Sequence, residues 1–447
     1  MNITEQLTYR KIFLFWGPLA LTWLMMAAEA PILLSIIARL GDTKYNLAAF
    51  GIAMAFALIV EAPVIMLMSA STALVRDRDS YLKLKRFTDI LNISVTVVQL
   101  IILIPSVFRF IVMDLMGVPE NVSNLTHVSL LILLPWAASI GYRRFFQGIL
   151  IRNNLTRRVT YGTLVRLTVI ILVGFILFHA GIEGSYVGAT ALSLAVLLEA
   201  IATRIMVNNT IKAILNDTII NNGLISSSTG KEELTYKSIR KFYTPLALTS
   251  ILSLGVHPFV TFFLGKSYMA LESLAVLPVV SSLVFIFRSI GLSYQEVNIA
   301  LIGEDKQNYR ALRNFAIMLG VLVTLLLSLI AFTPLASIWF VKVSGLSMEL
   351  AGLSYLPLKI MILLPAMTVL LNFQRSTLVI NGTTKPISTA TAIELVVIVA
   401  VLLVCVVFMN LIGVVAASIA FIIGKGIANL YLTPRQISTI RGWFSKG

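Results

Sequence analysis

The stretch FWGPLALT at residues 15–22 returns as FYTPLALT at residues 242–249, 227 positions further along the chain. Other residues pair at the same shift: Pro31 with Pro258, Leu47 with Leu274, Asp77 with Glu304, and Gln147 with Gln374. Self-similarity at a fixed long period is the signature of a duplicated structural unit. The sequence therefore predicts two related halves.

The composition places these halves in a membrane. Of the 447 residues, 58% are hydrophobic and 12% are charged, whereas ordinary soluble domains have about 45–50% and about 25%. The apolar runs are continuous, whereas the strands of a membrane barrel alternate lipid-facing and lumen-facing residues. We therefore predict an all-α polytopic membrane protein and exclude a water-soluble one. The single cysteine, Cys405, excludes an intramolecular disulfide.

Twelve apolar stretches are long enough to span a bilayer, which takes about 20 residues each. They lie near 13–37, 46–75, 88–113, 125–151, 160–180, 185–207, 242–265, 272–302, 314–341, 353–380, 388–409 and 411–432. We expect an N-terminal six-helix lobe at 1–207, a cytoplasmic linker at 208–241 and a C-terminal six-helix lobe at 242–447. Because each lobe has an even number of spans, a pseudo-twofold axis along the membrane normal should relate the two lobes.

The net charge of +15 is explained by membrane topology rather than by a nucleic-acid partner. When the N-terminus and every second loop are assigned to the cytoplasm, 26 of the 35 Lys and Arg residues fall on that side. Cytoplasmic loops carry such an excess by the positive-inside rule. We expect an integral protein of the plasma (cell inner) membrane with both termini in the cytoplasm, no nucleic-acid partner, and a first span that is retained.

Several motifs, in their order along the chain, resemble a known family. They are Gly41-Asp42 and Leu47-Ala48-Ala49-Phe50-Gly51 after the first helix, Phe145-Phe146-Gln147-Gly148 followed by Asn153-Asn154 in the fourth, and Gly188-Ala189-Thr190-Ala191 in the sixth. With the duplication and the span count, the chain resembles the multidrug/oligosaccharidyl-lipid/polysaccharide (MOP) exporter superfamily, which includes the multidrug and toxic compound extrusion (MATE) transporters. The resemblance implies a MATE-like fold and secondary active efflux by antiport.

Within this superfamily the chain is also similar to the progressive-ankylosis type of exporter, through residues 47–53, Arg76-Asp77 and residues 242–248. MATE relatives imply export of organic cations coupled to Na⁺ or H⁺, whereas ankylosis-type relatives imply efflux of small anions such as pyrophosphate, citrate or nucleotides. The first-helix aspartate typical of MATE transporters is absent, and Glu29 is the nearest acid. The helix-seven acid of some MATE branches is also missing, and His257 lies in that region.

Two acidic residues within spans are predicted to bind the coupling ion. Glu29 precedes Pro31 by two residues, and Glu61 precedes Pro63 by two residues. A proline removes a backbone hydrogen bond and leaves a carbonyl free, so a carboxylate beside it could hold H⁺ or Na⁺. An ionisable residue in a span costs roughly 2.5–3.5 kcal/mol and usually faces a cavity or a partner. The alternatives are an interfacial position for Glu29 and an ion pair within the lobe for Glu61.

A polar set in the second lobe is predicted to bind the substrate: His257, Arg288, Tyr294, Gln295 and Glu296. A planar guanidinium can hold a carboxylate or phosphate through two parallel hydrogen bonds. Arg288 would therefore favour an anionic substrate if it faces a cavity, and its alternative role is a permanent ion pair with Glu61 or Glu296. His257 could sense protons near neutral pH, or it could be a structural hydrogen-bond donor.

The other polar residues of the spans have simpler interpretations. Gln147 and Gln374, which are related by the repeat, are included among the substrate contacts, with interhelical hydrogen bonding as their alternative role. Opposite charges in neighbouring spans of one lobe favour buried pairs that fix packing. Two structural ion pairs are predicted on this basis: Arg166 with Glu199, and Glu394 with Lys425.

These features predict a secondary active exporter of a small organic solute that works by alternating access, with an anionic metabolite slightly favoured over an organic cation. One lobe would rock against the other, with Pro31, Pro63 and Pro258 as hinges. We expect a functional monomer in the bilayer that needs no cofactor or metal site apart from a coupling ion, H⁺ or Na⁺. The alternative is a flippase of lipid or lipid-linked glycan. An enzyme is not expected, because the sequence shows no constellation of catalytic residues.

Overall fold

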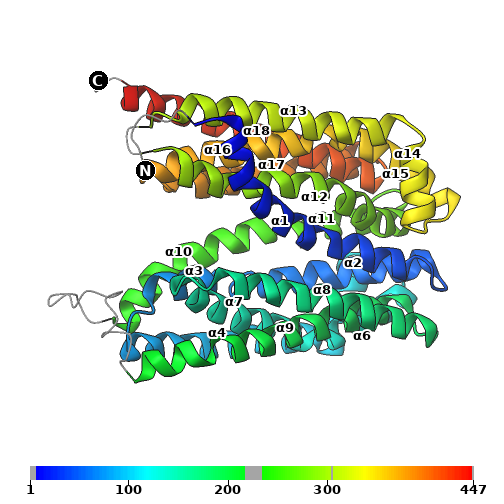
Figure 1. Ribbon diagram of the computed structural model, residues 1–447. Coiled ribbons are helices and arrows are strands. Elements are labelled where there is room, and N and C mark those ends of the chain that lie inside the picture. Colours follow the sequence, from blue (N-terminus) through cyan, green and yellow to red (C-terminus); the bar gives the residue numbers. More distant parts are fainter. Residues whose placement is uncertain (1–6, 217–233, 304–305, 445–447) are drawn as a thin grey trace. The chain divides into compact units, whose positions relative to one another are not determined.

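The structure is a computed structural model that describes residues 7–216, 234–303 and 306–444. Within these ranges the chain forms helices and no strand, apart from one isolated bridge between Tyr268 and Ile412. The described residues contain 12 helices long and apolar enough to cross a membrane. The predicted count of twelve spans is therefore confirmed. Figure 1 shows the helices of the chain.

The first six spans are built from nine α-helices and one π-helix. These are α1 (Tyr9–Ile37), α2 (Thr43–Glu61), α3 (Leu67–Leu74), α4 (Arg78–Leu103), α5 (Pro105–Arg109), η1 (Phe110–Leu115), α6 (Glu120–Ile132), α7 (Leu134–Arg152), α8 (Thr156–His179) and α9 (Gly184–Leu215). The last six are built from α10 (Tyr236–Leu254), α11 (Val256–Gly265), α12 (Ala270–Leu301), α13 (Tyr309–Phe332), α14 (Leu335–Ser337), η3 (Ile338–Val343), α15 (Met348–Ile360), η4 (Met361–Leu363), α16 (Leu364–Ile380), α17 (Lys385–Leu402), η5 (Leu403–Phe408) and α18 (Gly413–Phe444).

The expected linker at 208–241 is shorter in the structure. Helix α9 continues to Leu215, and α10 already begins at Tyr236. Residues 217–233 of this linker lie outside the described residues.

The starts of α1 and α10 show how the repeat is encoded locally. Thr8 caps α1 by accepting a hydrogen bond from the Lys11 amide at 3.4 Å, and Thr235 caps α10 by accepting one from the Ser238 amide at 3.2 Å. The shift of the repeat relates the two threonines. A side-chain oxygen at this position satisfies one of the free N–H groups of the first turn, so both repeats begin their first helix in the same way.

The contacts divide the chain into two compact units. We call residues 49–258 the N-terminal unit, and residues 1–48 with 259–447 the C-terminal unit. This division differs from the expected lobes at 1–207 and 242–447, because α1 packs on α12 and α13 whereas α10 packs on α3 and α4. The first helix of each sequence half therefore belongs to the unit formed mostly by the other half.

The first helices of the two halves, α1 and α10, are thus exchanged between the units. Two repeat-related aromatic residues make polar contacts that stabilise this exchange. The indole of Trp16 in α1 donates a hydrogen bond to the hydroxyl of Ser293 in α12 at 2.8 Å. Tyr243 of α10 is the repeat equivalent of Trp16, and its hydroxyl donates to the carbonyl of Pro63. Since a buried aromatic N–H or O–H needs a partner, each contact helps to hold its helix in the exchanged place.

The duplication is also visible in the backbone. Helix α2 begins at Thr43 and α3 ends at Leu74, and the shift of the repeat places these ends at the start and the end of α12. One connection repeats as well: a short helix, a π-helix and then a glycine with positive φ occur before α6 and again before α15, with Gly117 at 75° and Gly345 at 76°. The pseudo-twofold axis between the halves stays a prediction.

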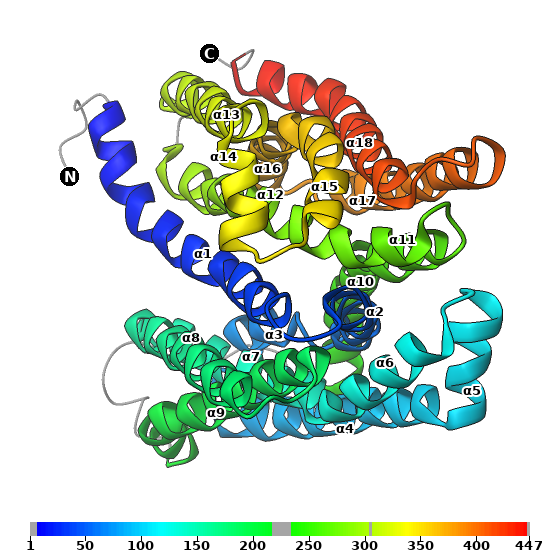
Figure 2. The same cartoon turned by 90° about the vertical axis from the view of Figure 1, so that its right-hand side faces the viewer.

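Each unit is a bundle with its own packed centre. In the N-terminal unit α7 packs against α3, α4 and α9, and α8 packs along α9 (Figure 2). In the C-terminal unit α16 packs against α12, α13 and α18, and α17 packs along α18. A large core cluster of the C-terminal unit joins α1, α12, α13 and α16 around Tyr294, Phe315 and Phe373. The charged side chains described next lie on the helices of these two bundles.

Candidate functional site

The N-terminal unit contains a buried group of charged side chains around Glu199. The Glu199 cluster consists of Glu61, Arg143, Arg144, Gln147, Arg166 and Glu199. Glu199 of α9 accepts a hydrogen bond from Arg143 Nη1 at 2.5 Å and one from Gln147 Nε2 at 3.3 Å, and it lies 3.6 Å from Arg166 Nε. The predicted pair of Arg166 with Glu199 is therefore confirmed, but Arg143 is the closer partner.

Among the described residues, Glu61 and Arg144 are the members of this cluster that form no hydrogen bond or ion pair with Glu199. Glu61 is 5% exposed, and among the described residues its Oε2 has no hydrogen-bond partner. Its carboxylate interacts electrostatically with Arg143, Arg144 and Arg166. Arg144 donates through Nη1 to the sulfur of Met68 at 3.7 Å, which is a weak acceptor. These two side chains therefore keep binding capacity that the packing of the unit does not use.

The backbone next to Glu61 is interrupted. Helix α2 ends at Glu61, residues 62–66 form turns, and α3 resumes at Leu67. Pro63 has no N–H to donate to the preceding turn, and its carbonyl is taken by Tyr243. Glu61 therefore lies beside a helix break at Pro63, as predicted. The Pro63 carbonyl is not free to bind an ion, because it accepts the hydrogen bond from Tyr243.

The C-terminal unit holds a second group, the Glu394 cluster, which consists of Arg288, Arg375, Glu394 and Lys425. Lys425 of α18 forms an ion pair with Glu394 of α17, which confirms the second predicted pair. Glu394 also interacts electrostatically with Arg288 and Arg375. One carboxylate thus stands against three basic groups, so the cluster has an excess of positive charge.

Arg288 and Arg375 are held by hydroxyl groups rather than by carboxylates. Arg288 Nε donates to Thr368 Oγ1 at 3.2 Å, and Arg375 Nη2 donates to Thr391 Oγ1 at 3.1 Å. Within the described part of the chain neither arginine lies within 4.0 Å of an acidic oxygen. Each guanidinium therefore keeps N–H groups that could bind an anion.

The predicted substrate residues of α12 separate into different environments. Tyr294 is fully buried, stacks on Phe315 at 5.7 Å and donates its hydroxyl to the carbonyl of Leu312 at 2.7 Å. This corrects the prediction, because a side chain enclosed in the core with its hydroxyl engaged cannot contact a solute. Gln295 is half-buried and Glu296 is exposed in its unit. No hydrogen bond of the described residues joins either of them to Arg288.

The two predicted amides lie beside the clusters. Gln147 belongs to the Glu199 cluster, and its Oε1 has no hydrogen-bond partner among the described residues. Gln374 donates to the Asn429 carbonyl at 3.2 Å and to Thr433 Oγ1 at 3.0 Å. Gln374 therefore has the interhelical role that was the alternative, and Gln147 keeps an acceptor free.

The predicted ion-coupling and hinge residues lie in different parts of the chain. Glu29 is half-buried in α1 of the C-terminal unit, and Glu61 lies in the N-terminal unit. His257 is exposed near the start of α11, immediately before Pro258, which is the last residue of the N-terminal unit. Pro31 lies inside the continuous helix α1. Of the three predicted hinges, Pro258 is at a boundary between units and Pro63 is at a helix break.

Sequence reasoning missed Arg143, Arg144 and Arg375 as site residues: the predicted spans at 125–151 and 353–380 contain them, but the charge count assigned them to the cytoplasmic side. The structure places Arg143 and Arg144 inside α7, which continues to Arg152, and Arg375 inside α16. The available signal was the uninterrupted helical stretch around Phe145 and Phe146, since charges flanked by apolar residues on both sides belong to the span. None of the described residues forms a group of three His, Cys, Asp or Glu that could hold a metal ion.

Comparison with known proteins places the fold. No family model and no curated protein matches the sequence. A multidrug resistance MATE family transporter of the MOP superfamily, in an inward-facing conformation, has a TM-score of 0.72 and 15% identity over 95% of this chain and 98% of that chain. The lipid II flippase MurJ has a TM-score of 0.68 and 15% identity over 94% of this chain and 87% of that chain.

A third similar structure is also a transporter of the MOP superfamily. A MOP superfamily transporter from Pyrococcus furiosus, described as having a binding pocket of reverse polarity that suggests a different function, has a TM-score of 0.59 and 15% identity over 97% of this chain and 99% of that chain. These similarities show that the chain has the fold of the MATE and MOP transporters, as the sequence predicted. The ankylosis-type resemblance stays a prediction.

Proposed function

We propose that this chain, which has the MATE-type fold, is a secondary active exporter of a small organic anion that works by alternating access. The fold supports a membrane transporter, and the charges of the two clusters support the sign of the substrate. In this proposal the basic side chains of the Glu199 cluster and those of the Glu394 cluster are each, taken separately, a candidate contact for the solute. It keeps the preference for an anionic metabolite over an organic cation.

The observation that carries the proposal is the excess of arginine over carboxylate inside the spans. Arg144, Arg288 and Arg375 are half-buried, and no described acidic oxygen lies within ion-pair distance of them. A charged residue inside a membrane span is costly and usually serves a pathway or a ligand. Arginine also cannot shed its proton in a protein. An anionic solute would supply the missing negative charge.

The chemistry of the arginines narrows the substrate class. A guanidinium presents several N–H donors in one plane and can hold a carboxylate or a phosphate through two parallel hydrogen bonds. Arg288 uses its Nε on Thr368 and has two terminal nitrogens left. A small polycarboxylate or a phosphate compound fits this donor set, whereas an organic cation would be repelled.

Coupling to H⁺ at Glu61 is part of the proposal, with Na⁺ as the alternative ion and Glu29 as the alternative site. Glu61 is buried and has one oxygen without a hydrogen-bond partner among the described residues. When this carboxylate takes up a proton, the Glu199 cluster loses one negative charge and gains attraction for an anion. A coupling ion drives transport only by binding two states with different affinity, and a tenfold preference is worth about 1.4 kcal/mol.

The hinge and the topology complete the proposal. Pro258 lies where the N-terminal unit ends, and Pro63 lies in the break between α2 and α3. These positions are where bending would accompany alternating access. We place both termini in the cytoplasm of the plasma (cell inner) membrane, because the Lys and Arg excess falls on that side, and we expect a monomer to function.

Transport into proteoliposomes tests the proposal. The purified protein would be offered labelled pyrophosphate, labelled citrate and a fluorescent organic cation under imposed H⁺ or Na⁺ gradients. We expect saturable uptake of an anion that is lost in Arg288→Ala and kept in Arg109→Ala, an exposed arginine of α5 outside both clusters. Loss of the dependence on the H⁺ gradient in Glu61→Gln would support the coupling site. Uptake of the cation without uptake of either anion would overturn the proposal.

A lipid flippase is the second candidate, and the similarity to MurJ along 94% of this chain favours it. A flippase would move a fluorescent phospholipid between leaflets of the same vesicles, where a reductant that cannot cross the bilayer reports the exposed fraction. Flipping in the absence of anion uptake would select this candidate. Anion uptake without flipping would exclude it.

A further inference from the structure

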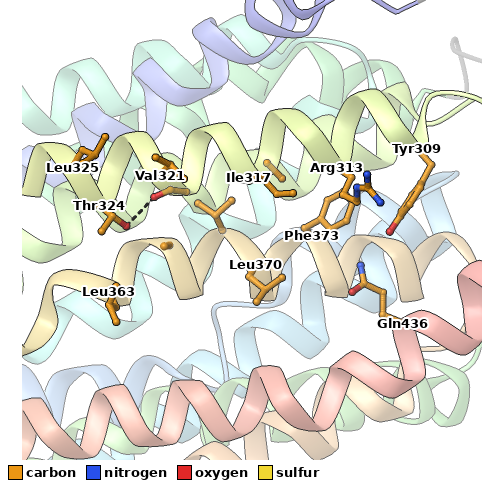
Figure 3. Close-up of a pocket in the computed structure, with 14 residues that line it drawn as sticks. Tyr309, Arg313, Ile317, Val321, Thr324, Leu325, Leu363, Leu370, Phe373 and Gln436 are labelled. Atoms are coloured by element: carbon orange, nitrogen blue, oxygen red, sulfur yellow. Dashed lines mark hydrogen bonds between the residues drawn. The ribbon is translucent and has the colours of Figure 1, made fainter.

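The C-terminal unit contains an apolar groove that neither charged cluster uses. It lies between α13 and α16, has a volume of about 580 Å³, and runs from Tyr309 and Arg313 at one end to Leu325 and Leu363 at the other (Figure 3). We propose that this groove binds one acyl chain of an anionic phospholipid, with the lipid headgroup at Arg313. This proposal is independent of the transported substrate.

Small residues create the space between the two helices. Gly320 of α13 faces Ala366 of α16, and a Cβ added at Gly320 would lie 3.7 Å from the Ala366 Cβ. Ala316 lines the same floor. Since helices approach to the distance that their contact residues permit, these positions leave a channel along the helix pair that larger side chains would fill.

The walls of the groove are apolar and open toward the surroundings. Ile317, Val321, Leu325 and Leu370 line it and are between 45% and 62% exposed. Away from the Tyr309 end, the polar side chain of the lining is Thr324, which lies near Leu325, and its hydroxyl donates to the Gly320 carbonyl of its own helix at 2.8 Å (Figure 3). Because α13 and α16 belong to candidate membrane spans, we expect this open face to meet lipid chains.

The polar groups gather at one end. Tyr309, Arg313 and Gln436 lie together there, as Figure 3 shows. Arg313 is exposed and, among the described residues, it donates hydrogen bonds to the neutral side chain of Asn314. A basic residue between spans on the cytoplasmic side is a typical partner of an anionic lipid headgroup. By the charge bias of the loops, the start of α13 is the cytoplasmic end of this span.

The length of the groove selects a lipid chain over a partner helix. Arg313 and Leu325 are 12 residues apart on α13, which corresponds to about 18 Å along the helix axis. One leaflet of the hydrocarbon core is about 15 Å thick. A transmembrane helix of a second protein would need a surface along the whole 24-residue helix α13, but the lining residues of that helix stop at Leu325, well before its end at Phe332.

Native mass spectrometry of the full chain in mild detergent, with equal amounts of phosphatidylglycerol and phosphatidylcholine added, tests the proposal. We expect one phosphatidylglycerol to be retained by the protein. Gly320→Leu, which fills the groove, should abolish its retention, whereas Gly352→Leu should not, since a Cβ at Gly352 meets nothing within 4 Å. Ala366→Val narrows the groove from the opposite helix and provides a milder variant if Gly320→Leu does not fold.

The headgroup contact has its own control. Arg313→Gln should lower the preference for phosphatidylglycerol over phosphatidylcholine about fivefold, the factor expected for one basic residue at the membrane surface. Arg310→Gln removes an exposed arginine of the same helix that does not line the groove, and it should leave the preference unchanged. Equal retention by the Gly320→Leu and Gly352→Leu proteins would overturn the proposal. Conversion of a dimer to a monomer by Gly320→Leu would also overturn it and would assign the groove to a second copy.

Discussion

Positions 61 and 288 are equivalent in the two halves of the chain, related by the shift of the repeat, yet one is a glutamate and the other is an arginine. Glu61 ends α2 where the span is interrupted, whereas Arg288 lies within the uninterrupted helix α12. Pro63 removes a backbone donor from the first span, and Ile290 stands at the equivalent place in the second. The duplication kept the length of the span and changed both its continuity and its charge.

The structural ion pairs are reversed in the same way. In the N-terminal unit the basic partner, Arg166, comes from α8 and the acidic partner, Glu199, comes from α9. In the C-terminal unit the acidic partner, Glu394, comes from α17 and the basic partner, Lys425, comes from α18. Since the fold accepts either order of charges, it does not by itself require the surplus arginines. The proposed anionic substrate would account for their presence.

The largest expected effect distinguishes these two pairs. Glu199→Gln leaves Arg143 and Arg166 buried without their carboxylate and should lower the free energy of unfolding by about 3–5 kcal/mol. Glu394→Gln should cost less, about 1–3 kcal/mol, because Lys425 can release its proton whereas an arginine cannot. Denaturant titration of both variants in detergent would measure the difference. Glu349→Gln, at an exposed residue, is the control. Equal losses of unfolding free energy in Glu199→Gln and Glu394→Gln would contradict the expected difference between arginine and lysine partners.

An intermediate effect is expected at position 148, where the halves differ again. Gly148 of α7 faces α3, and an added Cβ would lie 1.8 Å from Ser71 Oγ and 2.3 Å from the Met68 carbonyl oxygen. The equivalent position in the other half is Arg375. Gly148→Ala should therefore push α3 from α7 and cost about 1–3 kcal/mol of unfolding free energy.

Thermal unfolding of Gly148→Ala beside Gly352→Ala would measure this cost, because an added Cβ at Gly352 meets nothing within 4 Å. A midpoint for Gly148→Ala that matches both the control and the unaltered chain would show that α3 and α7 do not pack this closely.

The smallest expected effect concerns the exchanged first helices. Tyr243→Phe removes the hydroxyl that binds the Pro63 carbonyl, and Trp16→Phe removes the indole that binds Ser293. Each variant should lose about 1 kcal/mol of unfolding free energy, the usual contribution of one hydrogen bond. Tyr236→Phe, at an exposed tyrosine of α10, should change nothing. If neither Trp16→Phe nor Tyr243→Phe changes the free energy of unfolding, apolar packing alone keeps α1 and α10 in their exchanged positions.

The sequence was sufficient for features that depend on composition and periodicity. Continuous apolar runs predicted the twelve spans, and the matched residues around Pro18 and Pro245 predicted the duplication. The exchange of α1 and α10 could not be predicted, because the two helices share the same central motif, Pro-Leu-Ala-Leu-Thr, at residues 18–22 and 245–249. In a lipid environment such a helix can bury its apolar face against the helices of either unit. Packing against particular side chains then determines which unit the helix joins.

The charged clusters were predicted only in part for a similar physical reason. Opposite charges on neighbouring spans indicated Arg166 with Glu199, since an isolated charge in a span is costly. The predicted spans at 125–151 and 353–380 contain Arg143 and Arg375, but the charge count treated both residues as cytoplasmic, and the structure shows them well inside α7 and α16. Tyr294 was misjudged because its sequence neighbours Gln295 and Glu296 are polar, and only the packing against Phe315 reveals which face of α12 is buried.

The central claim is that the surplus arginines bind an anion, and calorimetric titration of the detergent-solubilised protein tests it most directly. Pyrophosphate, citrate and an organic cation would be titrated into the unaltered chain, Arg288→Ala and Arg109→Ala. The account predicts saturable binding of at least one anion, weakened at least tenfold by Arg288→Ala and unchanged by Arg109→Ala, with no binding of the cation. Saturable binding of the cation in the absence of any anion binding would contradict it.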